Sequence, residues 1–151
     1  MTDHAQTRLP PSTNEDRTLA MVVHALLLAG FFTSGVTSIV GVVLAYVKRD
    51  TPDAVAASHY DHAVGTFWIG FLGTLLAFGV IVGGIVAMAV AGAGASDPDW
   101  STVASPATLI VGIVLAVLGG VGVLAVQIWV LIRAVFGLIR LSDGRPIGRA
   151  V

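Results

Sequence analysis

The sequence predicts an all-α integral membrane protein, a helical bundle built from three long apolar segments. The first observation is composition: 56% of the residues are hydrophobic and 11% are charged, whereas an ordinary soluble domain carries about 25% charged residues. The second is the position of the charges, which are absent from residues 19–47, 64–95 and 101–132. Each of these runs is longer than the roughly 20 residues that cross a bilayer as a helix.

Composition also excludes several classes of protein. The length of 151 residues allows one domain. A net charge of −1 does not suit a nucleic-acid partner, which calls for a basic patch. The absence of cysteine excludes disulfides and cysteine-ligated metals. The sequence contains no phosphate-binding loop, HExxH, GxSxG or dinucleotide motif. We therefore expect no enzyme activity, no catalytic residue and no cofactor.

The first apolar run permits two structures. Residues 1–17 read as a polar tail whose capping-box pattern starts a helix near Asn14. Residues 19–47 then form either one strongly tilted helix or two short helices in a hairpin. The hairpin is possible because residues 30–38 are rich in glycine and in hydroxyl side chains, and such a segment can break a membrane helix.

The other two runs belong to helices with recognisable starts. Thr51 is the expected N-cap of a helix over 52–60, with Pro52 at its first position. That helix leads into the second run, either unbroken or with a bend at Gly65. Ser105 and Pro106 start the last helix in the same way, and it ends near Leu141. Residues 18–141 thus form one transmembrane domain, and residues 142–151 a short basic tail.

Basic residues set the expected orientation. Lys and Arg are enriched in cytoplasmic flanks of membrane helices. The loop over 48–63 and the C-terminal end carry such residues, whereas the loop over 93–105 carries none. We therefore expect the C-terminus in the cytoplasm and the 93–105 loop outside. A hairpin over 19–47 also places Arg8 and Arg17 inside, which favours it over a single crossing.

Small residues recur at four-residue spacing on the second and third runs. Such rows let membrane helices approach closely. They predict packing either between the second and third helices of one chain or between copies of the chain. The rows consist of Gly79, Gly83, Ala87 and Ala91, and of Gly112, Ala116 and Gly120.

Four polar residues are candidates for function. His24 is the only group within an apolar run that titrates near neutral pH, and intramembrane ionisable groups are functional candidates by default. His59 and His62 share a helix face. With Asp61 they form either a metal site, with His24 as a distant third histidine, or a structural helix end. We favour the structural helix end and expect no metal site, because a full set of ligands cannot be named. Arg133 flanks the cytoplasmic end of the last helix, where it would meet anionic headgroups.

Several segments together resemble a family of small uncharacterised bacterial inner-membrane proteins in the Tic-twenty-like and MamF-like superfamily. The resemblance covers roughly residues 18–147. Its departure is at residues 61–65, where an arginine common in the family is missing. The segments are His24, Gly41–Arg49, Ser58–Tyr60, Thr66–Gly70, Trp129–Arg133, Gly137-Leu138, Leu141 and Gly144–Ile147.

The resemblance and the residues lead to two functional hypotheses. The first is a non-enzymatic, multi-pass protein of the bacterial cytoplasmic membrane that acts as a structural or protein-interaction component. Its partners would be the lipid bilayer and either further copies of itself or other membrane proteins. The alternative is a subunit of a small oligomeric transporter or channel, with the histidines lining a polar path.

Overall fold

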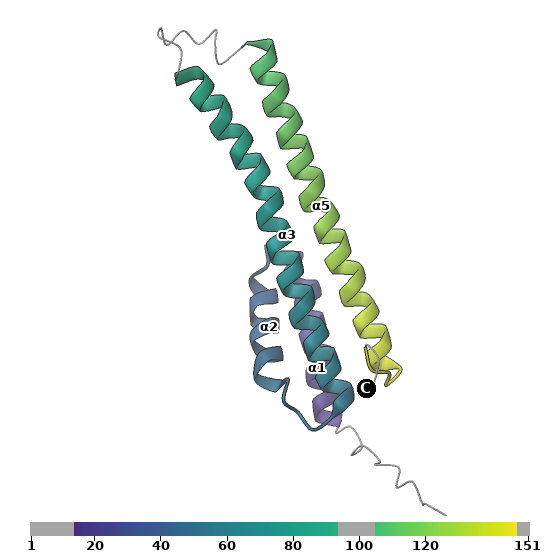
Figure 1. The fold of residues 1–151 in the computed structure, drawn as a ribbon. Helices are drawn as coiled ribbons and strands as arrows, with labels where there is room; N and C mark the ends of the chain where they lie inside the picture. Colours follow the sequence, from purple (N-terminus) through teal and green to yellow (C-terminus); the bar gives the residue numbers. More distant parts are fainter. Residues whose placement is uncertain (1–13, 94–104, 148–151) are drawn as a thin grey trace, which may run out of the picture. The chain divides into compact units, whose positions relative to one another are not determined.

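The computed structural model describes residues 14–93 and 105–147, with the backbone alone for 91–93. These residues form four helices and no strand: α1 (Asn14–Gly30), α2 (Val36–Lys48), α3 (Ala54–Ala93) and α5 (Pro106–Ser142) (Figure 1). The chain divides into two units. The hairpin unit runs up to Trp68 and resumes at Val130, and the two-helix unit is Ile69–Trp129.

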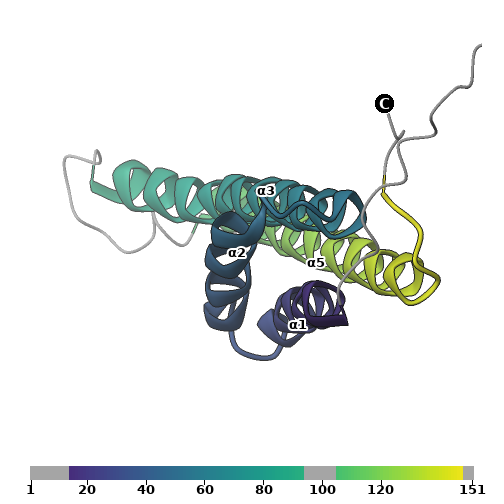
Figure 2. The same ribbon diagram turned by 90° about the horizontal axis from the view of Figure 1, so that it is seen from below.

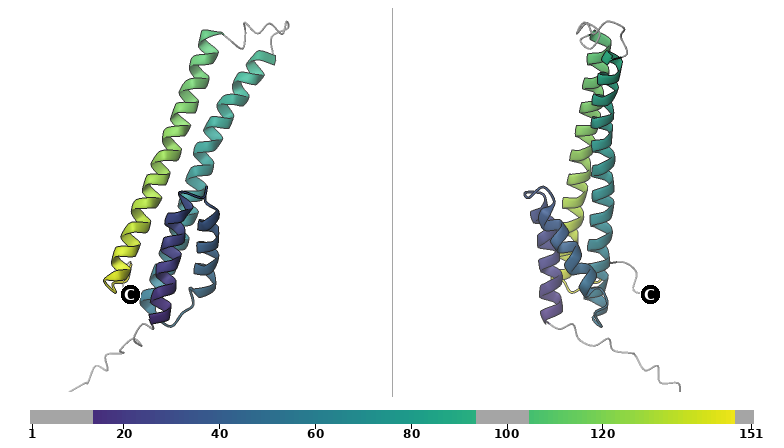
Figure 3. Two further views of the ribbon diagram at one scale, coloured as in Figure 1. Left: turned by 180° about the vertical axis from the view of Figure 1, so that it is seen from behind. Right: turned by 90° about the vertical axis from the view of Figure 1, so that its left-hand side faces the viewer.

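The first apolar run is a hairpin, not one helix. Helices α1 and α2 pack against each other and remain side by side from every direction of view (Figures 2 and 3). The chain reverses at Ser34 and Gly35, whose φ angles are 52° and 88°. Glycine adopts this left-handed conformation without steric cost. A Cβ on Gly41 would lie 3.0 Å from Leu26 Cβ, a tight contact, so glycine at this position favours the close approach of the two arms.

Helix α3 is continuous through Gly65, so the first of the two expected alternatives is confirmed there. Its start differs from the prediction. Asp53, not Thr51, is the N-cap, because its Oδ1 accepts a hydrogen bond from the Val55 amide at 2.9 Å. Pro52 consequently precedes the helix instead of opening it.

Both ends of α5 follow the sequence expectation. Ser105 Oγ accepts a hydrogen bond from the Thr108 amide at 3.3 Å, as an N-cap does. At the other end Gly144 has a φ of 67°, and its amide donates to Leu141 O. The Arg145 amide donates to Arg140 O, which completes a Schellman C-terminus. The expected loop over 93–105 lies outside the described residues, apart from its first and last positions.

In the two-helix unit, the residues through which α3 and α5 meet match the predicted rows only in part. A Cβ added to Gly79 or Gly83 would meet nothing within 4 Å. The prediction that this row packs against α5 of the same chain is therefore wrong at these two glycines. Ala87 is exposed, and the Ala91 side chain lies outside the described residues. The α3 residues that contact α5 in this unit include Gly73, Ala77, Ile81, Gly84 and Met88.

The predicted row on α5 is only partly at this contact. Gly112 is buried against Met88, as predicted. Ala116 is exposed, and a Cβ on Gly120 would meet nothing within 4 Å. Gly119, one residue earlier, is the glycine that abuts Ala77 and Ile81. Both helices are apolar around their whole circumference, so spacing alone does not show which row faces the neighbour.

Two stretches of the described residues are long and apolar enough to cross a membrane, Ala54–Val90 and Pro106–Ser142. Only 17% and 11% of their most apolar windows are buried within the structure. Large apolar side chains are therefore exposed along both helices, which is unlike the core helix of a soluble protein.

Candidate functional site: a buried histidine and arginine cluster

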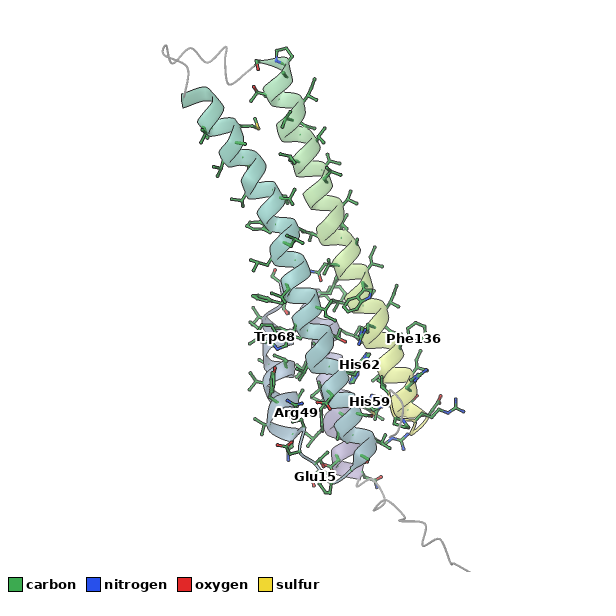
Figure 4. All side chains as sticks on the ribbon, viewed as in Figure 1. Glu15, Arg49, His59, His62, Trp68 and Phe136 are labelled. Atoms are coloured by element: carbon green, nitrogen blue, oxygen red, sulfur yellow. The ribbon has the colours of Figure 1, made fainter. Side chains whose placement is uncertain are left out.

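The four candidate residues from the sequence come together in the hairpin unit. His24 comes from α1, His59 and His62 from α3, and Arg133 from α5. The His24 ring centroid lies 5.4 Å from that of His59 and 6.3 Å from that of His62. In Figure 4 His59 and His62 point from α3 toward α5. We call His24, His59, His62 and Arg133 the histidine cluster.

Each imidazole of the histidine cluster is fixed by a backbone carbonyl. Because a carbonyl oxygen can only accept, the ring nitrogen that faces it carries a proton. His24 and His59 are fully buried. The contacts are His24 Nδ1 to Ala20 O at 2.9 Å, His59 Nε2 to Arg145 O at 3.0 Å, and His62 Nε2 to Arg133 O at 3.4 Å.

Arg133 links α5 to α3 through its side chain. Its Nε donates to Thr66 Oγ1 at 2.9 Å, and one terminal nitrogen lies 3.4 Å from His62 Nδ1. Thr66 is fully buried and donates in turn to His62 O at 2.7 Å. The contact of Arg133 with headgroups stays a prediction, and within the chain its side chain anchors a polar network between the two helices.

His24 lies directly against α5 at Gly137. A Cβ at position 137 would collide with Nε2 and Cδ2 of the His24 ring. His24 Nε2 and His59 Nδ1 are both buried and have no hydrogen-bond partner. The small side chain of Ala134, also buried, lies one turn before Gly137. Glycine at 137 is thus what lets the imidazole occupy this space.

The geometry does not favour the metal site that the sequence left open. Asp61 Oδ1 lies 2.9 Å from an Arg49 nitrogen, and both side chains are about half exposed. Asp61 therefore pairs with α2 rather than with the histidines. Among residues 14–93 and 105–147, no three His, Cys, Asp or Glu side chains are arranged to hold a metal ion.

Further residues complete the site without having been expected there. The buried Tyr60 hydroxyl donates to Asp16 O at 3.3 Å and so ties α3 to the start of α1. Arg17 donates to Ser142 O, which ties α1 to the end of α5. Only the four-residue spacing of Gly137 from Arg133 could have indicated a shared helix face, and such spacing is common in this glycine-rich sequence.

Comparison of the chain with protein-family models, curated proteins and solved structures finds no match.

Proposed function

We propose that this chain is a non-enzymatic integral protein of the bacterial cytoplasmic membrane that acts as a structural or protein-interaction component. The observation that carries the proposal is the apolar surface of α3 and α5. Large side chains such as Leu76, Val90 and Ile113 are 74%, 65% and 62% exposed. Water does not tolerate such surface over two whole helices, whereas lipid and neighbouring membrane helices cover it.

The outward row on α3 suggests how a neighbour is held. Gly79, Gly83 and Ala87 are exposed, and added Cβ atoms at the two glycines would enter open space. In a bilayer, small residues at this spacing let a second helix backbone approach closely. Among residues 14–93 and 105–147 nothing packs against Gly79 or Gly83, so the row is available to another copy or to a different membrane protein.

Extraction and crosslinking test the proposal together. The chain lacks cysteine, so single cysteines can be introduced at Gly83 and at the nearby Ile81. Ile81 is the control because it faces Gly119 of the same chain and already carries a Cβ atom. With a photoreactive maleimide in native membranes, we expect intermolecular adducts from position 83 and not from 81. We also expect the protein to resist carbonate extraction.

Either of two results contradicts the proposal. Release by carbonate removes the membrane assignment. If the protein stays in the membrane but position 83 gives no adduct, the row does not make protein contacts.

A transporter subunit is the second candidate, and the histidine cluster favours it. Three imidazoles and a guanidinium inside an apolar helical unit are the kind of groups that line ion and proton paths. Proteoliposomes with a pH-sensitive dye inside test this candidate. Proton flux that is abolished in His62→Gln would favour transport, and absence of flux at equal protein density favours the first proposal.

A further inference from the structure

We propose that the α1–α2 hairpin is a re-entrant membrane element, which dips its turn into the lipid and returns to the side from which it enters. This inference rests on the proposed membrane location of α3 and α5 and adds a lipid-binding surface to it. The turn, residues 31–35, is the part that enters most deeply.

The arms are too short to cross the bilayer. With 17 residues in α1 and 13 in α2, they are about 26 Å and 20 Å long at 1.5 Å per residue. The hydrocarbon core is about 30 Å thick. The arms run antiparallel and are held together near the turn. Thr37 Oγ1 donates to Leu26 O at 3.1 Å, and Ser38 Oγ lies 3.4 Å from Leu27 O. Both open ends of the hairpin therefore lie on the same side.

Most of the backbone amides in the turn meet the requirement that lipid imposes on non-helical backbone. Polar backbone groups cannot enter hydrocarbon unless other protein groups satisfy them. Thr33 Oγ1 lies 3.2 Å from Ala29 O and 2.9 Å from Thr37 Oγ1, and its single proton serves one of these two acceptors. It also accepts a hydrogen bond from the Thr37 amide at 3.3 Å. Backbone amides in and next to the turn also donate to carbonyls of the preceding turn. They are those of Phe31, Phe32, Thr33, Gly35 and Val36, with N to O distances of 2.8 to 3.2 Å.

Large apolar side chains make up most of the exposed surface of the turn and of α2, and Thr33 and Ser34 are the exposed polar residues of the turn. Phe32 is 84% exposed and Phe31 is 50% exposed, with their rings edge to face at the tip. The outer face of α2 continues this surface to the last turn of the helix. Its exposed members are Val36, Ile39, Val40, Val43 and Val47.

Charge is confined to the open ends of the hairpin, and this favours lipid over a protein as the covering partner. Glu15, Asp16 and Arg17 lie in the first turn of α1, while Lys48, Arg49 and Asp50 end α2. Tyr46 lies beside this charged end, with the Arg49 guanidinium carbon 5.9 Å from its ring centroid. From the tip to the open ends, the hairpin presents large apolar side chains, then an aromatic residue and then charges. A segment that leaves a bilayer shows the same order.

The inference can be tested with single-cysteine variants of the full chain in phosphatidylcholine and phosphatidylglycerol vesicles. The positions are Phe32 at the tip, Asp50 at the open end, and Val82 within α3 as the control for a membrane-spanning helix. Each cysteine carries a bimane fluorophore. Doxyl-labelled lipids quench from the hydrocarbon, and iodide quenches from water.

We expect positions 32 and 82 to lose fluorescence with doxyl lipids and not with iodide, and position 50 to show the reverse. Iodide quenching at 32 with lipid quenching at 82 would overturn the re-entrant hairpin alone. Iodide quenching at 82 would overturn the proposed membrane location. Protection of position 32 from both quenchers would show that protein covers the tip, and would also overturn the inference.

A second measurement separates re-entry from crossing. Cysteines replacing Thr18 and Asp50 should react with an impermeant maleimide from the same side of oriented membranes. Reaction from opposite sides would show that the segment crosses, and the inference would be wrong.

Discussion

Replacing Gly137 with alanine tests how α1 is held against α5. The added Cβ would collide with the His24 ring, which is buried and fixed to Ala20 O at 2.9 Å. Relief requires the ring to move and weakens that hydrogen bond. Overpacking of a filled core costs about 1–3 kcal/mol. Alanine also gains up to about 1 kcal/mol over glycine in helix propensity, which offsets part of the cost.

Gly120→Ala is the matched control, because it makes the same substitution in the same helix where a Cβ meets nothing within 4 Å. The propensity gain cancels between the two variants. We therefore expect Gly137→Ala to be less stable than Gly120→Ala by about 1–3 kcal/mol. Unfolding of the purified protein by sodium dodecyl sulfate in mixed micelles, followed by tryptophan fluorescence, measures the difference.

A double-mutant cycle isolates the contact itself. If the collision is the cause, Gly137→Ala should cost much less in a His24→Ala background, and the coupling should approach the full difference between the two glycine variants. Equal stability of Gly137→Ala and Gly120→Ala would refute the reasoning. So would an additive cycle.

Three further predictions use the same unfolding assay. Gly84→Val should lose about 1–3 kcal/mol of unfolding free energy, because its Cβ meets Leu115 Cβ at 2.9 Å. Gly83→Val places its side chain in open space and should lose much less in dispersed monomers. Equal losses would contradict the assigned packing face. Asp53→Ala should lose about 1 kcal/mol of unfolding free energy, because it removes the N-cap of α3. A larger loss in Thr51→Ala would show that Thr51 is the N-cap, as the sequence predicted. Thr66→Val removes the acceptor for Arg133 Nε and should cost about 1–3 kcal/mol, so an unchanged stability would show that the bond contributes nothing.

The sequence by itself determined where the helices lie. The charge-free runs mark the apolar segments, since a charge inside hydrocarbon is costly. Ser105 and Pro106 mark the start of α5, and Gly144 marks its end, because caps and left-handed glycines act through local backbone chemistry. The same locality explains the error at the start of α3, where Thr51 and Asp53 are both good caps and neighbouring residues decide between them.

The candidate site was visible only as separate residues. His24, His59, His62 and Arg133 stand out because each is polar in or beside an apolar run. Their meeting depends on how α1, α3 and α5 pack, and the spacing along one helix carries no information about a residue on another. Gly137 illustrates this, since its role comes entirely from the His24 ring that lies against it.

Only the tertiary structure decided which face of each helix is used. On α3 and α5 nearly every position is apolar, so hydrophobic periodicity cannot distinguish the row of Gly79 and Gly83 from the neighbouring Gly84. The sequence likewise left two structures possible for residues 19–47, a single helix or a hairpin. Ser34 and Gly35 permit a reversal, but the close contact at Gly41 and the hydrogen bonds of Thr37 and Ser38 between the arms select it.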